Sequence, residues 1–211
     1  MAAAAPRRRS VWLHPAAKPL LFAASLLPFA WLFYAAATDQ LGANPQEHLI
    51  RSLGDWTLRF LCLTLAVTPL RVLTGQPALA RLRRMLGLFT YFYAGLHLVS
   101  YAWFDMGLEF AEIAADIAKR PFILVGFASF LLLTPLAATS FNRAIRALGA
   151  ARWQALHRIV YAVAGLAILH FTWMRAGKND FAEVFVYAGI LGLLLGWRLW
   201  RHLRAPRLQP G

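Results

Sequence analysis

The chain has 211 residues, of which 60% are hydrophobic and only 15% are charged, and its formal net charge is +13. Soluble domains carry about a quarter charged residues, so this composition excludes a soluble domain and indicates a membrane protein. The positive charge does not require nucleic acid as a partner, because cytoplasmic loops of membrane proteins collect Lys and Arg.

Stretches of about 17 to 25 mostly apolar residues predict membrane-spanning helices. Such stretches occur at 19–37, 56–73, 86–104, 122–139, 153–173 and 181–200. The predicted fold is therefore an all-α, six-transmembrane-helix bundle that forms a single domain over residues 1–211. The first stretch follows basic residues and looks like an export signal, but it is longer than a usual signal core and further stretches follow. We expect it to be retained as the first helix.

Charge separates the two sides of this bundle. With the N-terminus inside, the inner segments hold most basic residues: Arg7, Arg8, Arg9, Lys18, Arg71, Arg81, Arg83, Arg84, Arg143, Arg146, Arg152, Arg158, Arg198, Arg201, Arg204 and Arg207. The outer segments hold all the acidic residues together with Arg51, Arg59, Lys119, Arg120, Arg175 and Lys178. Because excess Lys and Arg mark the cytoplasmic side, both termini are predicted to be cytoplasmic. The basic rim is expected to contact anionic lipid headgroups.

Two features of the second stretch add local expectations. Cys62 is expected to be a small buried residue, and as the single cysteine it offers neither a disulfide nor a thiolate cluster. Pro69 is expected to bend or stop the helix near the inner face.

The outer loop after the third stretch, residues 105–120, mixes acidic and apolar residues. Phe110, Ile113 and Ile117 have helical spacing, which predicts a short amphipathic helix on the outer surface and a docking surface. His14, His48 and His202 are interpreted as solvated or headgroup-level side chains without a binding role.

Histidines within the apolar stretches are the strongest functional signal. An ionisable residue inside a membrane is costly and indicates a functional site. His97 lies 8 residues before Asp105 and His170 lies 5 residues before Arg175, so the two agree in depth, toward the outer side. Two imidazoles at one depth on two helices can hold one metal between them.

The chemistry of this pair favours a haem. Zinc sites have about four protein ligands, and no Cys or carboxylate lies at this depth. A haem iron takes one axial nitrogen from each face, and with both positions filled it favours electron transfer over oxygen binding or substrate chemistry. The sequence has no Cys-x-x-Cys-His motif, so the haem is expected to be non-covalent, of b type.

His157 and a set of arginines define the inner side. His157 precedes His170 by 13 residues, which is about 20 Å along a helix and about 140° around it. Three roles stay open for it: binding a second haem with an unusual partner, exchanging with another ligand, or contacting an electron donor. Arg71, Arg84, Arg152 and Arg158 are candidates for binding an anion there, whether haem propionate, flavin phosphate or lipid.

Several motifs together resemble one membrane-protein family. They are Leu26-Leu27-Pro28-Phe29, Thr68-Pro69-Leu70, RRMLGL at 83–88, LHLVSY at 96–101, Arg120-Pro121-Phe122, and WQALHRIVY at 153–161 followed by His170. On these residues essentially the whole chain resembles the haem-binding membrane subunits of bacterial periplasmic methionine sulfoxide reductase systems, within the ferric-reductase-like transmembrane group.

The resemblance implies six helices in the bacterial inner membrane and b-type haem held by His97 and His170, with His157 as a third family histidine. It implies electrons from the quinone pool or a cytosolic flavin reductase. Their acceptor would be a periplasmic molybdenum-containing subunit that reduces methionine sulfoxide in oxidised proteins. FMN is also attributed to the family, but the chain shows no flavin-binding motif. Relatives with two haem pairs have a second histidine on helix three, which is absent here, so one haem is expected.

Three functional hypotheses follow. The leading one is a transmembrane electron-transfer subunit that works with a separate catalytic subunit. The second is a stand-alone ferric or quinone reductase of the same fold. The third is a non-redox membrane scaffold whose histidines only pair between helices.

Overall fold

The structure, a computed structural model, describes residues 14–177 and 179–204. Arg7, Arg8, Arg9, Lys178 and Arg207, which the topology prediction uses, lie outside the described residues. Within those residues every regular element is a helix and no strand occurs, which confirms the all-α class.

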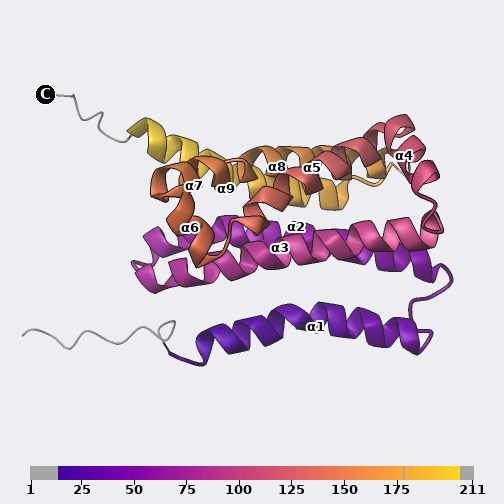
Figure 1. Ribbon diagram of the computed structural model, residues 1–211, viewed down its shortest axis with the longest axis horizontal. Coiled ribbons are helices and arrows are strands. Elements are labelled where there is room, and N and C mark those ends of the chain that lie inside the picture. The colour runs from indigo at the N-terminus through magenta and orange to yellow at the C-terminus, as the bar shows by residue number, and fades with distance from the viewer. Residues whose placement is uncertain (1–13, 178, 205–211) are drawn as a thin grey trace, which may run out of the picture.

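Long helices run side by side along the long axis of the molecule (Figure 1). They are α1 (Ala17–Ala37), α2 (Pro45–Leu73), α3 (Ala80–Ser100), α5 (Pro121–Ala138), α8 (Val160–Ala176) and α9 (Ala182–Arg204). Shorter elements connect them: η2 (Pro77–Leu79), the π-helical turn η3 (Tyr101–Asp105), α4 (Phe110–Lys119), α6 (Asn142–Leu148) and α7 (Ala150–His157). The presence of α4 confirms the short helix expected in the outer loop.

The second helix differs from its predicted range. It begins at Pro45, well before Trp56, because the Asn44 side chain caps it by accepting a hydrogen bond from the Glu47 amide at 3.3 Å. Proline in the first turn also suits a helix start, since its missing N–H is not needed there. The helix also continues through Pro69 and ends at Leu73. Counting apolar residues overlooked the polar turns that extend this helix.

The fifth apolar stretch forms two helices instead of one. Between α7 and α8, the amides of Arg158 and Ile159 donate to carbonyls three residues back, those of Ala155 and Leu156. This tight turn separates the segment that carries His157 from the segment that carries His170.

Five segments of the described chain are long and apolar enough to cross a membrane: α1, α2, α5, α7 together with α8, and α9. The sixth expected crossing, α3, is not among them. Its first turns carry Arg81, Arg83 and Arg84, which lower its hydropathy. It nevertheless packs along the length of α2 (Figure 1).

The long helices other than α1 form a closed ring in the order α2, α3, α5, α8, α9 and back to α2. The interior of this ring holds a buried apolar cluster that includes Leu61, Leu133 and Val163. Cys62 belongs to the same cluster and is buried, as expected. Side chains projecting into the ring are therefore enclosed by protein on all sides of the bundle.

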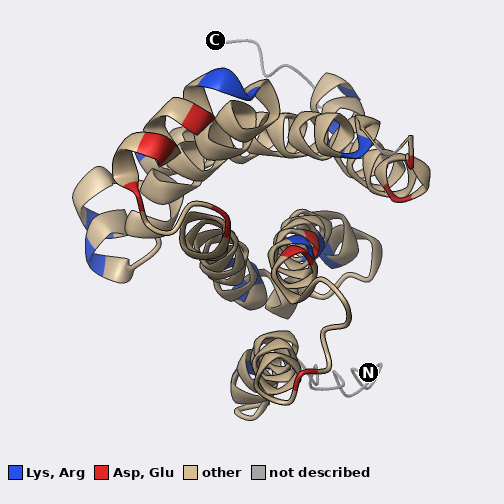
Figure 2. Cartoon of the chain, turned by 90° about the vertical axis from the view of Figure 1, so that its right-hand side faces the viewer, with Lys and Arg blue, Asp and Glu red and all other residues tan. Residues whose placement is uncertain are grey.

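The two ends of the ring differ in charge. The end on the right of Figure 1, which we call the acidic end, carries Asp39, Glu47, Asp105, Glu109, Glu112, Asp116, Asp180 and Glu183. The opposite, basic end carries Arg71, Arg81, Arg83, Arg84, Arg143, Arg146, Arg152, Arg158, Arg201 and Arg204. Figure 2 looks onto the acidic end, where acidic segments lie on the loops and on the helix nearest the viewer.

Helix α1 lies outside the ring and packs on α2 and α3. Its Pro28 removes one backbone donor, and Tyr93 of α3 enters the helix near this position. The Tyr93 hydroxyl donates to the carbonyl of Ser25 at 2.8 Å and accepts from the amide of Phe29 at 3.1 Å. Tyr93 is fully buried and its ring stacks on Phe60 at 5.1 Å. One hydroxyl thus replaces a backbone hydrogen bond of α1 and fixes that helix to the ring.

We expect Tyr93→Phe to weaken the attachment of α1, because it leaves the Ser25 carbonyl and the Phe29 amide unpaired. The loss of stability should be about 1–3 kcal/mol, measured as thermal unfolding of the purified protein in detergent. Tyr34→Phe, which changes an exposed tyrosine of α1, is the control. Equal melting of the two variants would show that the Tyr93 hydroxyl does not hold α1.

Candidate functional site

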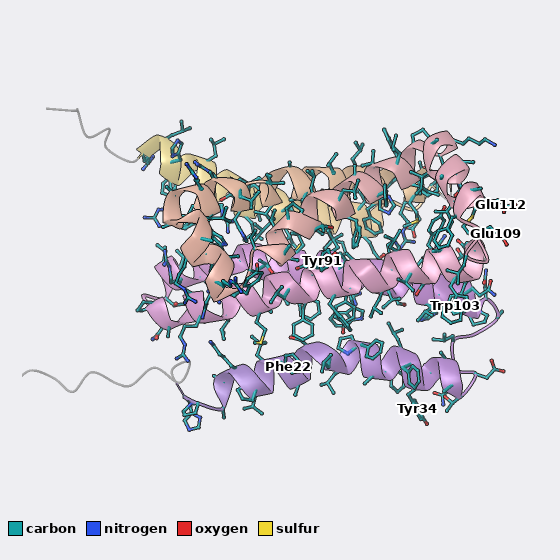
Figure 3. All side chains as sticks on the ribbon, in the orientation of Figure 1. Phe22, Tyr34, Tyr91, Trp103, Glu109 and Glu112 are labelled. Carbon is teal, nitrogen blue, oxygen red and sulfur yellow. The ribbon has the colours of Figure 1, made fainter. Side chains whose placement is uncertain are left out.

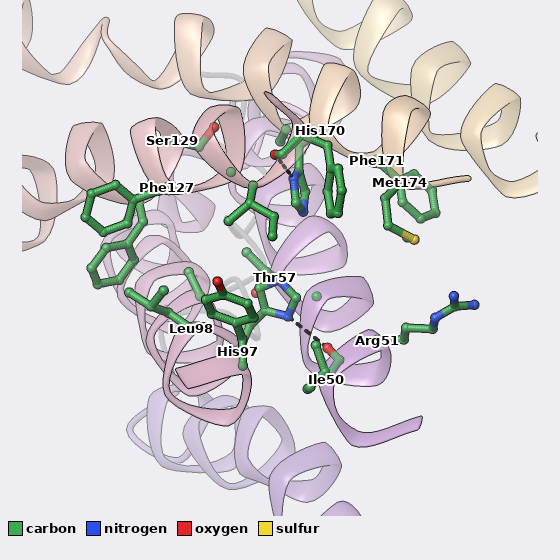
Figure 4. A pocket seen from close by; sticks show the side chains of 18 of the residues that line it. Ile50, Arg51, Thr57, His97, Leu98, Phe127, Ser129, His170, Phe171 and Met174 are labelled. Atoms are coloured by element: carbon green, nitrogen blue, oxygen red, sulfur yellow. Dashed lines mark hydrogen bonds between the residues drawn. The ribbon is translucent and has the colours of Figure 1, made fainter. Parts of the chain in front are cut away.

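Two histidines face each other inside the ring. His97 comes from α3 and His170 from α8, and their ring centroids are 6.2 Å apart with an angle of 77° between the planes (Figure 4). Both line a cavity of about 540 Å³ between α2, α3, α5 and α8. The structure therefore brings together the two histidines that were matched by depth in the sequence.

Both rings are held by the same kind of hydrogen bond. Nδ1 of His97 lies 2.8 Å from the carbonyl oxygen of Ile50, and Nδ1 of His170 lies 2.6 Å from that of Phe122. A carbonyl can only accept, so each Nδ1 carries the proton and donates. Each Nε2 then keeps its lone pair, which is the state in which a histidine binds a metal.

Glycines on neighbouring helices make room for the two rings. A Cβ added at Gly54 of α2 would lie 3.2 Å from Cε1 of His97. A Cβ added at Gly126 of α5 would lie 2.7 Å from Nδ1 of His170, closer than real Cβ atoms approach. These glycines therefore allow each imidazole to lie close to the backbone of the adjacent helix, where it reaches its carbonyl partner.

The cavity around the pair is mostly apolar, with one polar exception. Its walls include the apolar residues Leu58, Leu61, Ala94, Phe127, Phe130, Leu133, Val163 and Ala167. Ser129 of α5 also lines it, is only 7% exposed, and its hydroxyl has no hydrogen-bond partner in the described part of the chain. Other helical hydroxyls, such as Thr90 and Thr172, donate to the carbonyl four residues back. The Ser129 hydroxyl is thus available to a bound group.

This geometry suits one metal ion between two imidazoles. With metal–nitrogen bonds of about 2 Å on each side, two imidazoles facing across one ion have their ring centroids roughly 6 Å apart. Among the described residues, no group of three or more His, Cys, Asp or Glu side chains is placed to hold a metal ion. The two histidines are thus the two such side chains that this cavity offers to a metal between the rings, and a prosthetic group is one source of its other ligands. Apolar ligand cavities of about 300–1,000 Å³ are typical of such groups.

Charged residues surround the opening of this cavity at the acidic end. Arg51 pairs with Glu47 at 2.5 Å. Asp116 of α4 accepts a hydrogen bond from the Tyr101 hydroxyl at 2.5 Å and another from Arg120. The Arg120 hydrogen bond lowers the pKa of the Asp116 carboxyl, and the same contact raises the pKa of the Arg120 guanidinium. These contacts fasten α4 over the opening.

A second cavity of about 820 Å³ lies toward the basic end. It is lined by the basic residues Arg83, Arg84, Arg158, Arg198, Arg201, His157 and His202, and by no Asp or Glu of the described residues. Leu61, Thr90 and Leu133 line both cavities, so the two adjoin in the middle of the ring. The two cavities are thus neighbours inside the ring, one toward the basic end and one around the histidine pair.

His157 contacts Thr139 and Trp153 in the basic cavity. Its Nε2 lies 3.1 Å from the Thr139 hydroxyl, and Trp153 stacks on its ring at 3.9 Å while donating to the Thr139 carbonyl. His157 and the exposed His202 line the same cavity, although sequence reasoning gave His202 no role. His48 is exposed, as expected.

The arginines expected to bind anions divide into two groups. Arg84 and Arg158 line the basic cavity, and Arg84 donates to the Asn142 side chain at 2.7 Å. Arg71 and Arg152 are exposed at the same end but do not line that cavity.

Other residues of the two cavities were not singled out from the sequence. They are Gly54, Gly126, Ser129, Arg83, Arg198 and Arg201. A glycine inside an apolar helix costs stability and usually has a packing reason, and this was the signal available for Gly54 and Gly126.

Comparison with known proteins gives consistent matches. The family described as ferric reductase like transmembrane component matches residues 53–168, a range that includes His97 and His157. A protein of Polaromonas naphthalenivorans is 71% identical over 202 residues, covering 96% of this chain and 92% of the relative. A protein of Bordetella pertussis is 57% identical over 193 residues, covering 90% and 93%. One of Xanthomonas campestris pv. campestris is 48% identical over 198 residues, covering 91% and 89%.

These relatives share one name, protein-methionine-sulfoxide reductase heme-binding subunit MsrQ. No solved structure matches the chain.

We expect Gly126→Ala to destabilise the protein by about 1–3 kcal/mol, because the new methyl group overlaps the His170 ring. Gly165→Ala is the matched control, since a Cβ there meets nothing within 4 Å. It should be neutral or stabilising, because Ala favours a helix over Gly by about 1 kcal/mol. Thermal unfolding in detergent measures both effects.

A double-mutant cycle identifies the cause. If the His170 ring is what the new methyl group meets, the cost of Gly126→Ala should largely disappear in a His170→Ala background. An undiminished cost in that background would mean that the contact with His170 is not responsible.

Proposed function

This chain belongs to the ferric-reductase-like transmembrane family, in its MsrQ branch of haem-binding subunits of protein-methionine-sulfoxide reductase, and on that premise we propose that it is a membrane electron carrier. Electrons enter at the basic end and leave at the acidic end, by way of a b-type haem held between His97 and His170. The acceptor is the periplasmic molybdenum-containing subunit, which reduces methionine sulfoxide in oxidised proteins.

The observation that supports this proposal most strongly is that His97 and His170 lie close together and make the same kind of hydrogen bond. Each ring donates from Nδ1 to a backbone carbonyl and so keeps Nε2 unprotonated, and both residues line the shared cavity. Because these hydrogen bonds fix the tautomer and orientation of each ring, little has to reorganise when iron is bound. His97 and His170 would hold a haem here, and the haem would supply a one-electron carrier.

The type of haem follows from the lack of covalent attachment points. Cys62 is the single cysteine of the sequence, and it is buried among apolar residues of the ring. A haem here would therefore be held non-covalently, by His97 and His170 and by packing against the cavity walls, as in b-type sites. Ser129 is the one wall residue with an unused buried hydroxyl among those described, and it is free to bond a polar group of the ligand.

Electron entry is proposed at the basic cavity. Its arginines attract an anionic donor or a donor protein with an acidic surface, which accommodates either of the two expected sources, quinone or a cytosolic flavin reductase. Arg84 and Arg158 would contact an anionic group in the cavity, and Arg71 and Arg152 would attract it from the surrounding surface. His157 lies beside this entry point and is proposed to contact the donor or a second metal group. FMN is a further expectation from family resemblance, without an assigned site.

The route between the ends is proposed to follow the interior of the ring. The basic cavity and the histidine cavity adjoin at Leu61, Thr90 and Leu133. Electron transfer becomes faster as donor and acceptor approach, so a donor seated against this wall is favoured over one outside the ring.

Charge and helix arrangement support the orientation. The basic end is assigned to the cytoplasm by the positive-inside rule, which also places both termini there. We assign α3 as the sixth crossing, because it packs along α2 over its length although its own hydropathy is lower. The chain is thereby a single domain over residues 1–211 in the bacterial inner membrane, with its basic rim against anionic lipids.

The chain is proposed to be the electron-transfer subunit and its partner the catalytic subunit. A haem iron held by both His97 and His170 would have no open position for a sulfoxide, so we assign the sulfoxide chemistry to the partner. The role of the residues in this chain is to bind and orient the haem and to exclude water from it.

The test is the absorption spectrum of variants purified after expression with added haem. The wild-type protein is expected to show the Soret band of bound haem, and His97→Ala and His170→Ala should each lose most of it. Each substitution removes one of only two protein ligands. His48→Ala, which changes an exposed histidine of the acidic end, should keep the band.

Haem content that survives in both ligand variants would show that this pair is wrong. A wild-type protein without a Soret band would contradict the haem assignment itself. Turnover of soluble ferric complexes by the purified chain, without a partner, would favour a stand-alone reductase over an electron-transfer subunit.

A further inference from the structure

Positive charge from three separate parts of the chain converges on the basic cavity. Arg83 comes from α3, Arg158 from the turn after α7, and Arg198 and Arg201 from α9. The charge of Arg83 acts on both His157 and Arg198, so Arg83 and Arg198 are close enough to repel each other. Like charges gathered in one cavity destabilise the folded protein unless an opposite charge joins them.

No opposite charge lines this cavity in the described part of the chain. Its walls contain no Asp or Glu, and the described arginines that form ion pairs, Arg51, Arg120 and Arg175, all lie at the acidic end. The carboxylates Glu109 and Glu112 mark that end in Figure 3, opposite to the basic end. The described residues therefore leave the charge of this cavity without a counter-charge.

Arg198 shows this most clearly. It is half-buried, and its guanidinium donates to two neutral backbone carbonyls, that of Leu65 on α2 and that of Leu194 at 3.0 Å. Its central carbon lies 5.9 Å from the centroid of the Tyr161 ring. A guanidinium has five N–H donors, and the two carbonyls do not use all of them. Arg198 can therefore hold a further acceptor in the cavity while it keeps α9 attached to α2.

The charge asymmetry that orients a membrane protein does not explain this arrangement. The positive-inside rule needs basic residues at the cytoplasmic end, but it does not need them to converge on one cavity. Arg71, Arg143 and Arg146 satisfy the rule from exposed positions that do not line the cavity. The convergence of the other arginines points to a ligand.

The walls of the cavity define the chemistry of that ligand. Phosphate oxygens match the planar fork of Arg, and a phosphate monoester carries nearly two negative charges and three acceptor oxygens, which several arginines can share. Leu61, Leu133 and Trp153 add apolar and aromatic surface. The volume of about 820 Å³ suits a whole organic ligand better than a single ion.

We propose that the basic cavity is a binding site for an organic phosphate, whose phosphate is held by Arg83, Arg158 and Arg198. Its apolar body lies toward Leu61 and Leu133, beside the histidine cavity. This rests on the proposed function for the role of the ligand, since electron entry is assigned to the same cavity. The same chemistry has two sources, a phospholipid of the cytoplasmic leaflet and the phosphate ester of a soluble electron donor.

The test is the binding of two matched pairs of probes to the purified full-length protein in neutral detergent. Flavin mononucleotide and riboflavin differ by the phosphate. Dihexanoyl phosphatidic acid and dihexanoyl phosphatidylcholine share a phosphate, whose charge choline cancels in the second. In isothermal titration calorimetry at low salt, the anionic member of at least one pair should bind about tenfold more tightly than its counterpart. The pair with the larger preference identifies the source.

Two double variants locate the site. Arg83→Gln/Arg158→Gln removes two cavity charges and leaves the carbonyl contacts of Arg198 in place, so it should lower the affinity for the anionic probe about tenfold and hardly change that for its counterpart. Arg143→Gln/Arg146→Gln is the matched control. It removes the same charge from exposed positions of α6 outside the cavity, so it should lose little affinity.

Equal affinities within both pairs for the wild-type protein would show that the chain has no phosphate site. The same loss in both double variants, or no loss in either, would place the binding outside the cavity and overturn the inference. These measurements need no electron transfer, so either negative result leaves the proposed function standing. A purified protein without a Soret band would instead contradict the proposed function, and the binding test would still decide the phosphate site.

Discussion

The structure depends on keeping two imidazoles inside an apolar helical ring. An unpaired polar group in such surroundings costs about 1–3 kcal/mol or more. The N–H of each imidazole therefore needs a hydrogen-bond acceptor, and the other ring nitrogen keeps its lone pair. Ile50 and Phe122 meet this need with backbone carbonyls, and Gly54 and Gly126 provide the space in which the rings reach them. The same arrangement fixes the tautomer. The orientation of the two histidine rings is thus set by backbone positions on α2 and α5, which carry neither histidine.

The second organising constraint is the polarity of the ring interior. Its basic cavity collects arginines from α3, α9 and the turn after α7 without an opposing carboxylate among the described residues. Its acidic end is closed by α4, whose Asp116 bonds both Tyr101 and Arg120. In the proposed function, electrons enter and leave through different partners, and the opposite charge of the two ends would attract different partners. Leu61, Thr90 and Leu133 separate the two cavities in the middle of the ring.

Much of this arrangement could be predicted from local sequence patterns. Helical class, the short helix α4 and the burial of Cys62 follow from hydropathy and spacing, and the pairing of His97 with His170 follows from depth. The start of α2 was harder to predict from the sequence, because the Asn44 cap and the first turns of α2 are polar and lie outside any apolar window. The break between α7 and α8 and the roles of Gly54 and Gly126 depend on contacts between distant helices. The periodicity of one segment cannot predict such contacts.

The central claim is that His97 and His170 are the two axial ligands of one haem. Electron paramagnetic resonance of the oxidised, haem-loaded protein tests this most directly, because the spin state of ferric haem reports its axial ligands. The account predicts a low-spin signal characteristic of two imidazoles. A high-spin signal, which indicates an open or weakly held axial position, would contradict it.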